Sequence, residues 1–172
     1  MTYKYLTAPG VPKLITEAYK LLGVKEIKGD KHNPDILKWA ELTGLKNVYK
    51  ADEIPWCGLY VAYVCVMADK EPVKDPLWAR NWLKFGTKEP VAMLGDILVF
   101  SRGTGGHVGF YVGEDSTAYH VLGGNQGDSV SITRILKSRL LGARRPEWKI
   151  AQPQGVRVIT LGASGPISKN EQ

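Results

Sequence analysis

The first part of the chain has apolar residues at helical spacing. Residues 12–24 place an apolar stripe on one side of a helix that should stop at Gly23. A second helix is expected to follow, because Asn33 can cap its start and Pro34 suits its first position. This second pattern ends at Gly44. Two amphipathic helices are therefore predicted before residue 45.

A third helix is predicted to begin near Cys57. It is apolar nearly all round, which is typical of a helix buried at the centre of a domain. A fourth, short helix is expected within residues 75–86, where Trp78 and Trp82 lie one turn apart. Both tryptophans are predicted to lie in the core.

From Gly95 onward the pattern changes to short runs rich in β-branched and aromatic residues, separated by Gly, Asp and Ser. The runs are "GDILVFSR", "GHVGFYVGE", "TAYHVLGG" and "DSVSITRI". They predict an antiparallel meander, and helices followed by strands indicate an α+β fold with the third helix packed on the sheet. Residues 1–148 are predicted to form one domain, and residues 149–172 a weakly patterned, mobile C-terminal tail.

Composition and charge indicate a globular protein and argue against a nucleic-acid-binding or membrane protein. The 172 residues are 44% hydrophobic, which fits one globular domain. The net charge of +6 favours anionic partners, but Lys and Arg are spread along the chain without a basic-aromatic motif, so nucleic acid is not expected. No apolar run is long enough for membrane insertion or a signal peptide. We therefore expect synthesis in a cytoplasm.

The two cysteines, Cys57 and Cys65, lie eight residues apart in one predicted helix. The helical rise separates them by about 12 Å, which is beyond disulfide reach. No ligand set surrounds them in the sequence, so neither a metal nor another cofactor is expected.

The position of Cys57 suits a nucleophile, since backbone N–H groups at a helix start stabilise a thiolate. The local sequence alone leaves a second interpretation open, in which Cys57 is a small buried residue like Cys65. His107 opens a strand after a Gly-rich loop, and alternation places it opposite the valines of that strand. A lone strand histidine is more often structural. However, a helix-start cysteine, a strand-start histidine and a polar residue after them follow the chain order of papain-type catalysis.

Several motifs in this order resemble a known family. The segments are "LGVKEIKGDKHNPDIL", "DEIPWCGLYVAYV", "GDILVFSR", "GHVGFYVGE", "VLGGNQGDSVSI" and "GARRP". Together they resemble the papain-like bacterial cell-wall hydrolases of the NlpC and CHAP group, above all a branch found in phage endolysins and prophage regions. The resemblance covers residues 14–146. It implies an NlpC-type fold, in which the nucleophile starts a central helix that packs on an antiparallel meander.

By this resemblance, Cys57 is the nucleophile and His107 the general base. The third member, which orients the imidazole, varies within the group. Asn125 is favoured here because Gly123 and Gly124 leave room around it, and His120 is the alternative.

Weaker expectations concern residues before the nucleophile. Asp52 either caps the helix or binds a cationic group of the substrate, and Trp56 forms a wall of the cleft. The backbone N–H of Cys57 is expected in the oxyanion hole.

The resemblance implies a monomeric peptidoglycan hydrolase that cuts an amide bond in the stem peptide or cross-link through a thioester. Made in the bacterial host cytoplasm without a signal peptide, it would act on the periplasmic cell wall after release by a holin or by injection. Two alternatives stay open. One is a catalytically silent peptidoglycan-binding or structural phage component, and the other is an amidase or transferase that uses a different acyl donor.

Overall fold

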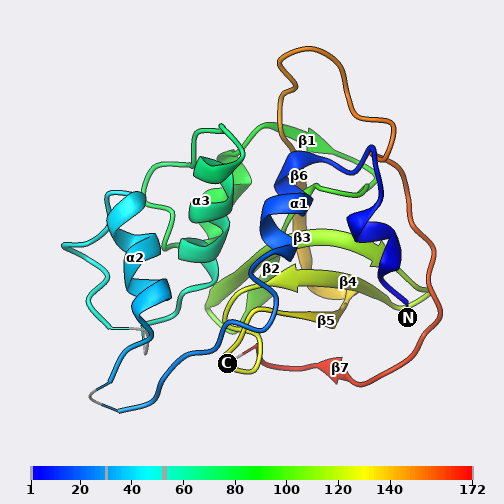
Figure 1. The fold of residues 1–172 in the computed structure, drawn as a ribbon. Coiled ribbons are helices and arrows are strands. Elements are labelled where there is room, and N and C mark those ends of the chain that lie inside the picture. The colour runs from blue at the N-terminus through cyan, green and yellow to red at the C-terminus, as the bar shows by residue number, and fades with distance from the viewer. Residues whose placement is uncertain (1, 30, 52–53, 172) are drawn as a thin grey trace.

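The computed structural model describes residues 2–29, 31–51 and 54–171 (Figure 1). Its α-helices are α1 (Lys13–Tyr19), α2 (Pro34–Leu42) and α3 (Cys57–Met67), and its 3-10 helices are η1 (Lys4–Thr7), η2 (Ala79–Lys84) and η3 (Lys137–Arg139). The strands are β1 (Thr87–Glu89), β2 (Ile97–Arg102), β3 (Gly105–Glu114), β4 (Ala118–Gly123), β5 (Ser131–Leu136), β6 (Leu140–Arg145) and β7 (Ile167–Ser168).

The strands form one sheet in the order β1-β6-β2-β3-β4-β5-β7. Neighbours pair antiparallel except β5 and β7, which run parallel. The predicted α+β class and the meander of β2 to β5 are confirmed. The complete sheet is mixed, because β7 is added at its edge.

Helix α3 packs on the sheet and on both other α-helices. It contacts β3, α1 and α2, and Figure 1 shows it between α2 and α1. The ring of Tyr60 meets Phe110 of β3 edge-on, and its hydroxyl donates to the Ala18 carbonyl of α1 at 2.9 Å. Burial on several sides explains why the sequence of α3 is apolar nearly all round. Its predicted start at Cys57 is confirmed.

The N-terminal helices follow their sequence signals. The side chain of Asn33 accepts a hydrogen bond from the Asp35 N–H at 2.9 Å, and Pro34 is the first residue of α2. Helix α1 ends at Tyr19, and the chain turns until Gly23, whose φ of 91° is in the left-handed region.

The prediction that Trp78 lies in the core is wrong, because its segment is not an α-helix. Trp78 precedes η2 in an extended conformation, so the one-turn spacing to Trp82 does not apply. Trp82 is fully buried and donates its ring N–H to the Pro76 carbonyl at 2.9 Å. Trp78 is 74% exposed.

Parts of the C-terminal segment, which the sequence predicts to be a mobile tail, lie against the sheet. Figure 1 shows it passing from the β1 side of the sheet round to β7 beside β5. On the way, the Glu114 N–H donates to the Ile159 carbonyl at 2.8 Å, and the Leu161 N–H donates to the Glu114 carbonyl at 2.7 Å. Near its end, Glu171 is only 1% exposed.

Most apolar residues of the helices pack in the core. Among the residues that the structure describes, no helix is both long enough and apolar enough to span a membrane.

Candidate active site

Cys57 is the first residue of α3, and its side chain is 3% exposed. The N-cap residue, Trp56, makes no side-chain hydrogen bond to the helix. The chain at Pro76 and Leu77 packs so closely on the first turn that a Cβ at Gly58 would collide with the Pro76 carbonyl. The glycine after the cysteine therefore lets another segment lie directly against the helix start.

His107 lies on β3, fully buried, opposite Phe100 of β2. Its Nε2 is 2.9 Å from Oε1 of Gln126. The side-chain amide of Gln126 also donates to the carbonyls of Val121 at 3.0 Å and Ser131 at 2.7 Å. Because that NH₂ group faces two acceptors, the oxygen faces the ring, and Nε2 of His107 must carry the hydrogen. Nδ1 is then the basic nitrogen of the neutral imidazole.

Nδ1 of His107 is the nitrogen left for the thiol of Cys57. It is buried and makes no regular hydrogen bond to any described atom. The thiol and the ring are nevertheless close enough for each to shift the pKa of the other. A loose contact of this kind is common between catalytic groups before a substrate binds.

This contact changes the pKa of both groups. Burial raises the pKa of the Cys57 thiol, but the hydrogen bond and charge of His107, the Val108 N–H and the charge of Arg102 outweigh burial and lower it below the ordinary value. Burial lowers the pKa of His107, but Cys57, the charge of Glu171 and the Gln126 hydrogen bond outweigh burial and raise it. Both directions favour a thiolate beside an imidazolium.

The partner of the imidazole is Gln126 rather than Asn125 or His120. Asn125 adopts a φ of 55° in the turn after β4, and no hydrogen bond joins its side chain to His107. Strand β4 ends at Gly123, so strand alternation does not extend to these positions. Within "GGNQ" the hydrogen bond to the imidazole therefore comes from Gln126 and not from the expected Asn125. The longer side chain of glutamine is the signal in the sequence, since only a long side chain reaches back to the ring.

His120 belongs to a different network. Its Nδ1 is 2.7 Å from the Tyr3 hydroxyl, and its Nε2 is 2.8 Å from Oδ2 of Asp115. Asp115 also accepts hydrogen bonds from Arg134 at 2.9 and 3.1 Å. Both ring nitrogens of His120 are therefore engaged away from Cys57.

Trp56, which precedes Cys57, packs in the core and not along a cleft. It is fully buried, its ring N–H donates to Glu26 at 3.2 Å, and its ring centroid is 6.0 Å from that of Trp39. It offers no exposed face for a substrate. Asp52, the other predicted substrate-binding residue, lies outside the described residues.

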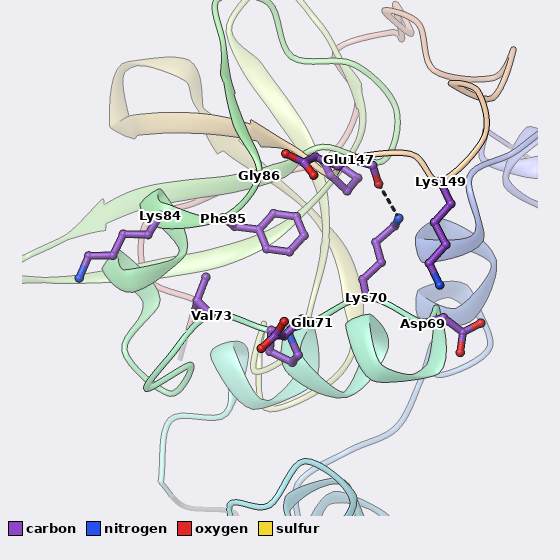
Figure 2. Close-up of a pocket in the computed structure, with 11 residues that line it drawn as sticks. Asp69, Lys70, Glu71, Val73, Lys84, Phe85, Gly86, Glu147 and Lys149 are labelled. Atoms are coloured by element: carbon purple, nitrogen blue, oxygen red, sulfur yellow. Dashed lines mark hydrogen bonds between the residues drawn. The ribbon is translucent and has the colours of Figure 1, made fainter.

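A pocket of about 470 Å³ lies elsewhere, beyond the C-terminal end of α3 (Figure 2). Lys70 donates to the Glu147 carbonyl at 2.9 Å, and its ammonium is 4.9 Å from the Trp148 ring centroid. The 11 residues of α3 separate this pocket from Cys57 by about 15 Å. Lysines and acidic residues both line it, so its charges largely balance.

Within the described residues, no cluster of three or more His, Cys, Asp or Glu side chains has the arrangement of a metal site.

No protein-family model and no curated protein sequence matches the chain. The function proposed below therefore rests on the geometry around Cys57 and on the motif resemblance.

Proposed function

We propose that this protein is a cysteine peptidase or amidase that hydrolyses an amide bond in the stem peptide or cross-link of peptidoglycan. The observation that carries the proposal is the series Cys57, His107 and Gln126, in which an amide fixes the tautomer of the imidazole next to a helix-start thiol. Supporting it are the shifted pKa values of both groups. The motif resemblance supplies the substrate class and the papain-like, NlpC-type assignment.

The first half of the reaction forms a thioester. The thiol proton passes to Nδ1 of His107, and the sulfur attacks the carbonyl carbon of the substrate amide. Negative charge develops on the carbonyl oxygen, and we expect the backbone N–H of Cys57 at the start of α3 to stabilise it. The carbon–nitrogen bond then breaks, and the amine leaves with the proton from Nδ1.

The second half regenerates the enzyme. His107 accepts a proton from water, whose oxygen attacks the thioester, and the carbon–sulfur bond breaks to release the acid and the Cys57 thiolate. Gln126 accepts a hydrogen bond from Nε2 throughout, so the ring keeps its orientation. The net charge of +6 gives the protein a general attraction to an anionic envelope. We place its action at the cell wall after release from the cytoplasm.

The test is digestion of purified Gram-negative peptidoglycan sacculi, with the products identified by mass spectrometry. Wild type and Cys65→Ala should release soluble fragments, whereas Cys57→Ala should release none while it stays folded. The fragment masses would identify the bond. If folded wild type releases nothing, the hydrolase proposal fails for this wall. Sacculus binding by both wild type and Cys57→Ala would then support a silent binding component.

A further inference from the structure

The hairpin between β2 and β3 brings an arginine beside the candidate catalytic residues. Phe100 pairs with His107, and Arg102 pairs with Gly105 two residues further along. Paired residues project from the same face of a sheet, as do residues two apart on a strand. Arg102 is therefore a diagonal neighbour of His107 on one face, at a typical separation of about 7–8 Å.

One nitrogen of the Arg102 guanidinium lacks a partner among the described residues. Its Nη1 is buried and makes no hydrogen bond within the described part of the chain. A buried donor without an acceptor is unfavourable, which makes it unusual in a folded protein. The neighbouring Arg80, by contrast, donates from Nε to the Gly105 carbonyl at 2.9 Å. Arg80 of η2 is thus engaged with the hairpin, whereas Arg102 within the hairpin keeps free hydrogen-bonding capacity.

We propose that Arg102 binds a carboxylate of the substrate next to the carbonyl that Cys57 attacks. This inference rests on the proposed function and specifies the substrate as an anionic peptide. An arginine fork matches a carboxylate with two parallel hydrogen bonds, which a lysine cannot reproduce. The charge of Arg102 also helps to lower the pKa of the Cys57 thiol, which agrees with its place beside His107 in the hairpin.

The chemistry of the proposed substrate agrees with this assignment. Glutamyl and diaminopimelyl residues of stem peptides carry carboxylates close to amide bonds. Arg102 is only half-buried, and a carboxylate bound to its guanidinium would orient the adjacent amide toward Cys57. The expected preference is for a free carboxylate over the corresponding carboxamide.

The first experiment measures alkylation of Cys57 and needs no peptidoglycan. Iodoacetate carries a carboxylate next to its reactive carbon, whereas iodoacetamide carries a neutral amide. We expect Arg102→Gln to lower the ratio of the iodoacetate to the iodoacetamide rate constant about tenfold, in line with a lost charge-assisted hydrogen bond. Arg102→Lys should fall between the two. Arg157→Gln, which removes the same charge from an exposed residue of the C-terminal segment, should keep the wild-type ratio.

Two results would overturn the assignment. One is an unchanged ratio in Arg102→Gln. The other is an equal slowing with both reagents, since Arg102 would then act on the thiol alone. The iodoacetamide rate also reports whether the variant keeps a reactive, folded site.

A second experiment connects Arg102 to hydrolysis. Synthetic stem peptides that differ only in a free or amidated α-carboxyl of the glutamyl residue are compared as substrates. Wild type should have the higher kcat/KM for the free acid, and Arg102→Gln should lose that preference, mainly through KM. Equal preference in both proteins would contradict carboxylate binding. If wild type cleaves neither peptide, the hydrolase proposal fails, while the alkylation ratio still decides the role of Arg102.

Discussion

The backbone of Gly123 lies directly against the side-chain amide of Gln126. A Cβ at Gly123 would be 2.5 Å from Oε1 and 2.9 Å from Cδ of Gln126. It would also be 3.4 Å from Nε2 of His107. The absence of a side chain at this one position therefore allows the hydrogen bond between glutamine and imidazole.

Gly123→Ala is expected to displace Gln126 and to lower kcat roughly tenfold to hundredfold, as when a hydrogen-bonding partner that orients a functional histidine is lost. Gln126→Ala should have a similar effect. Gly162→Ala is the matched control, because a Cβ there meets nothing within 4 Å. Asn125→Gly should stay active, since glycine accepts the φ of 55° at that position. An inactive Asn125→Gly with an active Gln126→Ala would reverse the assignment.

The two cysteines should differ in reactivity. The pKa of Cys57 is lowered because His107, Val108 and Arg102 outweigh burial, whereas burial raises the pKa of Cys65 to about 12. Iodoacetamide at increasing pH should therefore modify Cys57 with a midpoint below about 8.5, the ordinary thiol value, and leave Cys65 unmodified. In His107→Gln the midpoint should rise, because the main stabilisation of the thiolate is gone. Peptide mapping distinguishes the sites, and denatured protein should react at both.

The parts of the site that depend on local sequence patterns could be predicted. The apolar run with Pro-Trp-Cys at its start predicted the buried helix and the position of Cys57 at its first turn. The Gly-rich loop followed by alternating residues predicted the strand that carries His107. Gln126 was missed because the turn after β4, with its left-handed Asn125, decides which side chain reaches back.

Other features depend on contacts between distant segments. Trp78 was placed in the core on helical spacing, but its segment is extended before a 3-10 helix. The C-terminal segment has no strong periodicity, and its two-residue strand forms only by pairing with β5. Neither the exposure of Trp78 nor the pairing of β7 with β5 could be predicted from local spacing, since each depends on tertiary structure.

His120 is predicted to stabilise the fold without contributing to catalysis. His120→Gln should leave the Tyr3 hydroxyl or the Asp115 carboxylate without its present partner, at a cost of about 1–3 kcal/mol in the free energy of unfolding. The pH midpoint of Cys57 alkylation and the kcat should stay at wild-type values below the melting temperature. A lower melting temperature with unchanged kcat is thus expected, and a shifted midpoint would reinstate His120 as part of the site.

Trp78 is predicted to contribute to binding of the polymeric substrate. It is 74% exposed and lies between Leu77, beside Gly58, and Ala79, beside Gly106. An exposed indole at this position offers a flat apolar surface to a bound chain. Trp78→Ala should change the free energy of unfolding by less than about 0.5 kcal/mol, as is usual at the surface. The KM for sacculi should increase, while Cys57 alkylation stays constant. Unchanged digestion kinetics would exclude this role.

Glu171 is predicted to fasten the C-terminal segment beside the site. Its carboxylate accepts hydrogen bonds from Arg139 at 2.7 and 2.9 Å, and its carbonyl accepts one from the N–H of Gly127, next to Gln126, at 2.9 Å. Because Glu171 is buried, Glu171→Gln should lower the free energy of unfolding at neutral pH by about 3 kcal/mol. Glu41→Gln removes an exposed pair with Lys46 and should cost less than about 1 kcal/mol.

The effect of Glu171 should depend on pH in a defined direction. Burial raises the pKa of its carboxyl, but Arg139 and the charge of His107 outweigh burial and lower it in the folded protein. A lowered folded-state pKa gives stability that is present above the unfolded value, about 4.3, and is lost as the pH falls through the folded-state value. The difference between wild type and Glu171→Gln in urea unfolding should therefore shrink below about pH 4, because a protonated glutamate resembles glutamine. A difference that persists undiminished in acid would show that the charge of Glu171 is not what holds this segment in place.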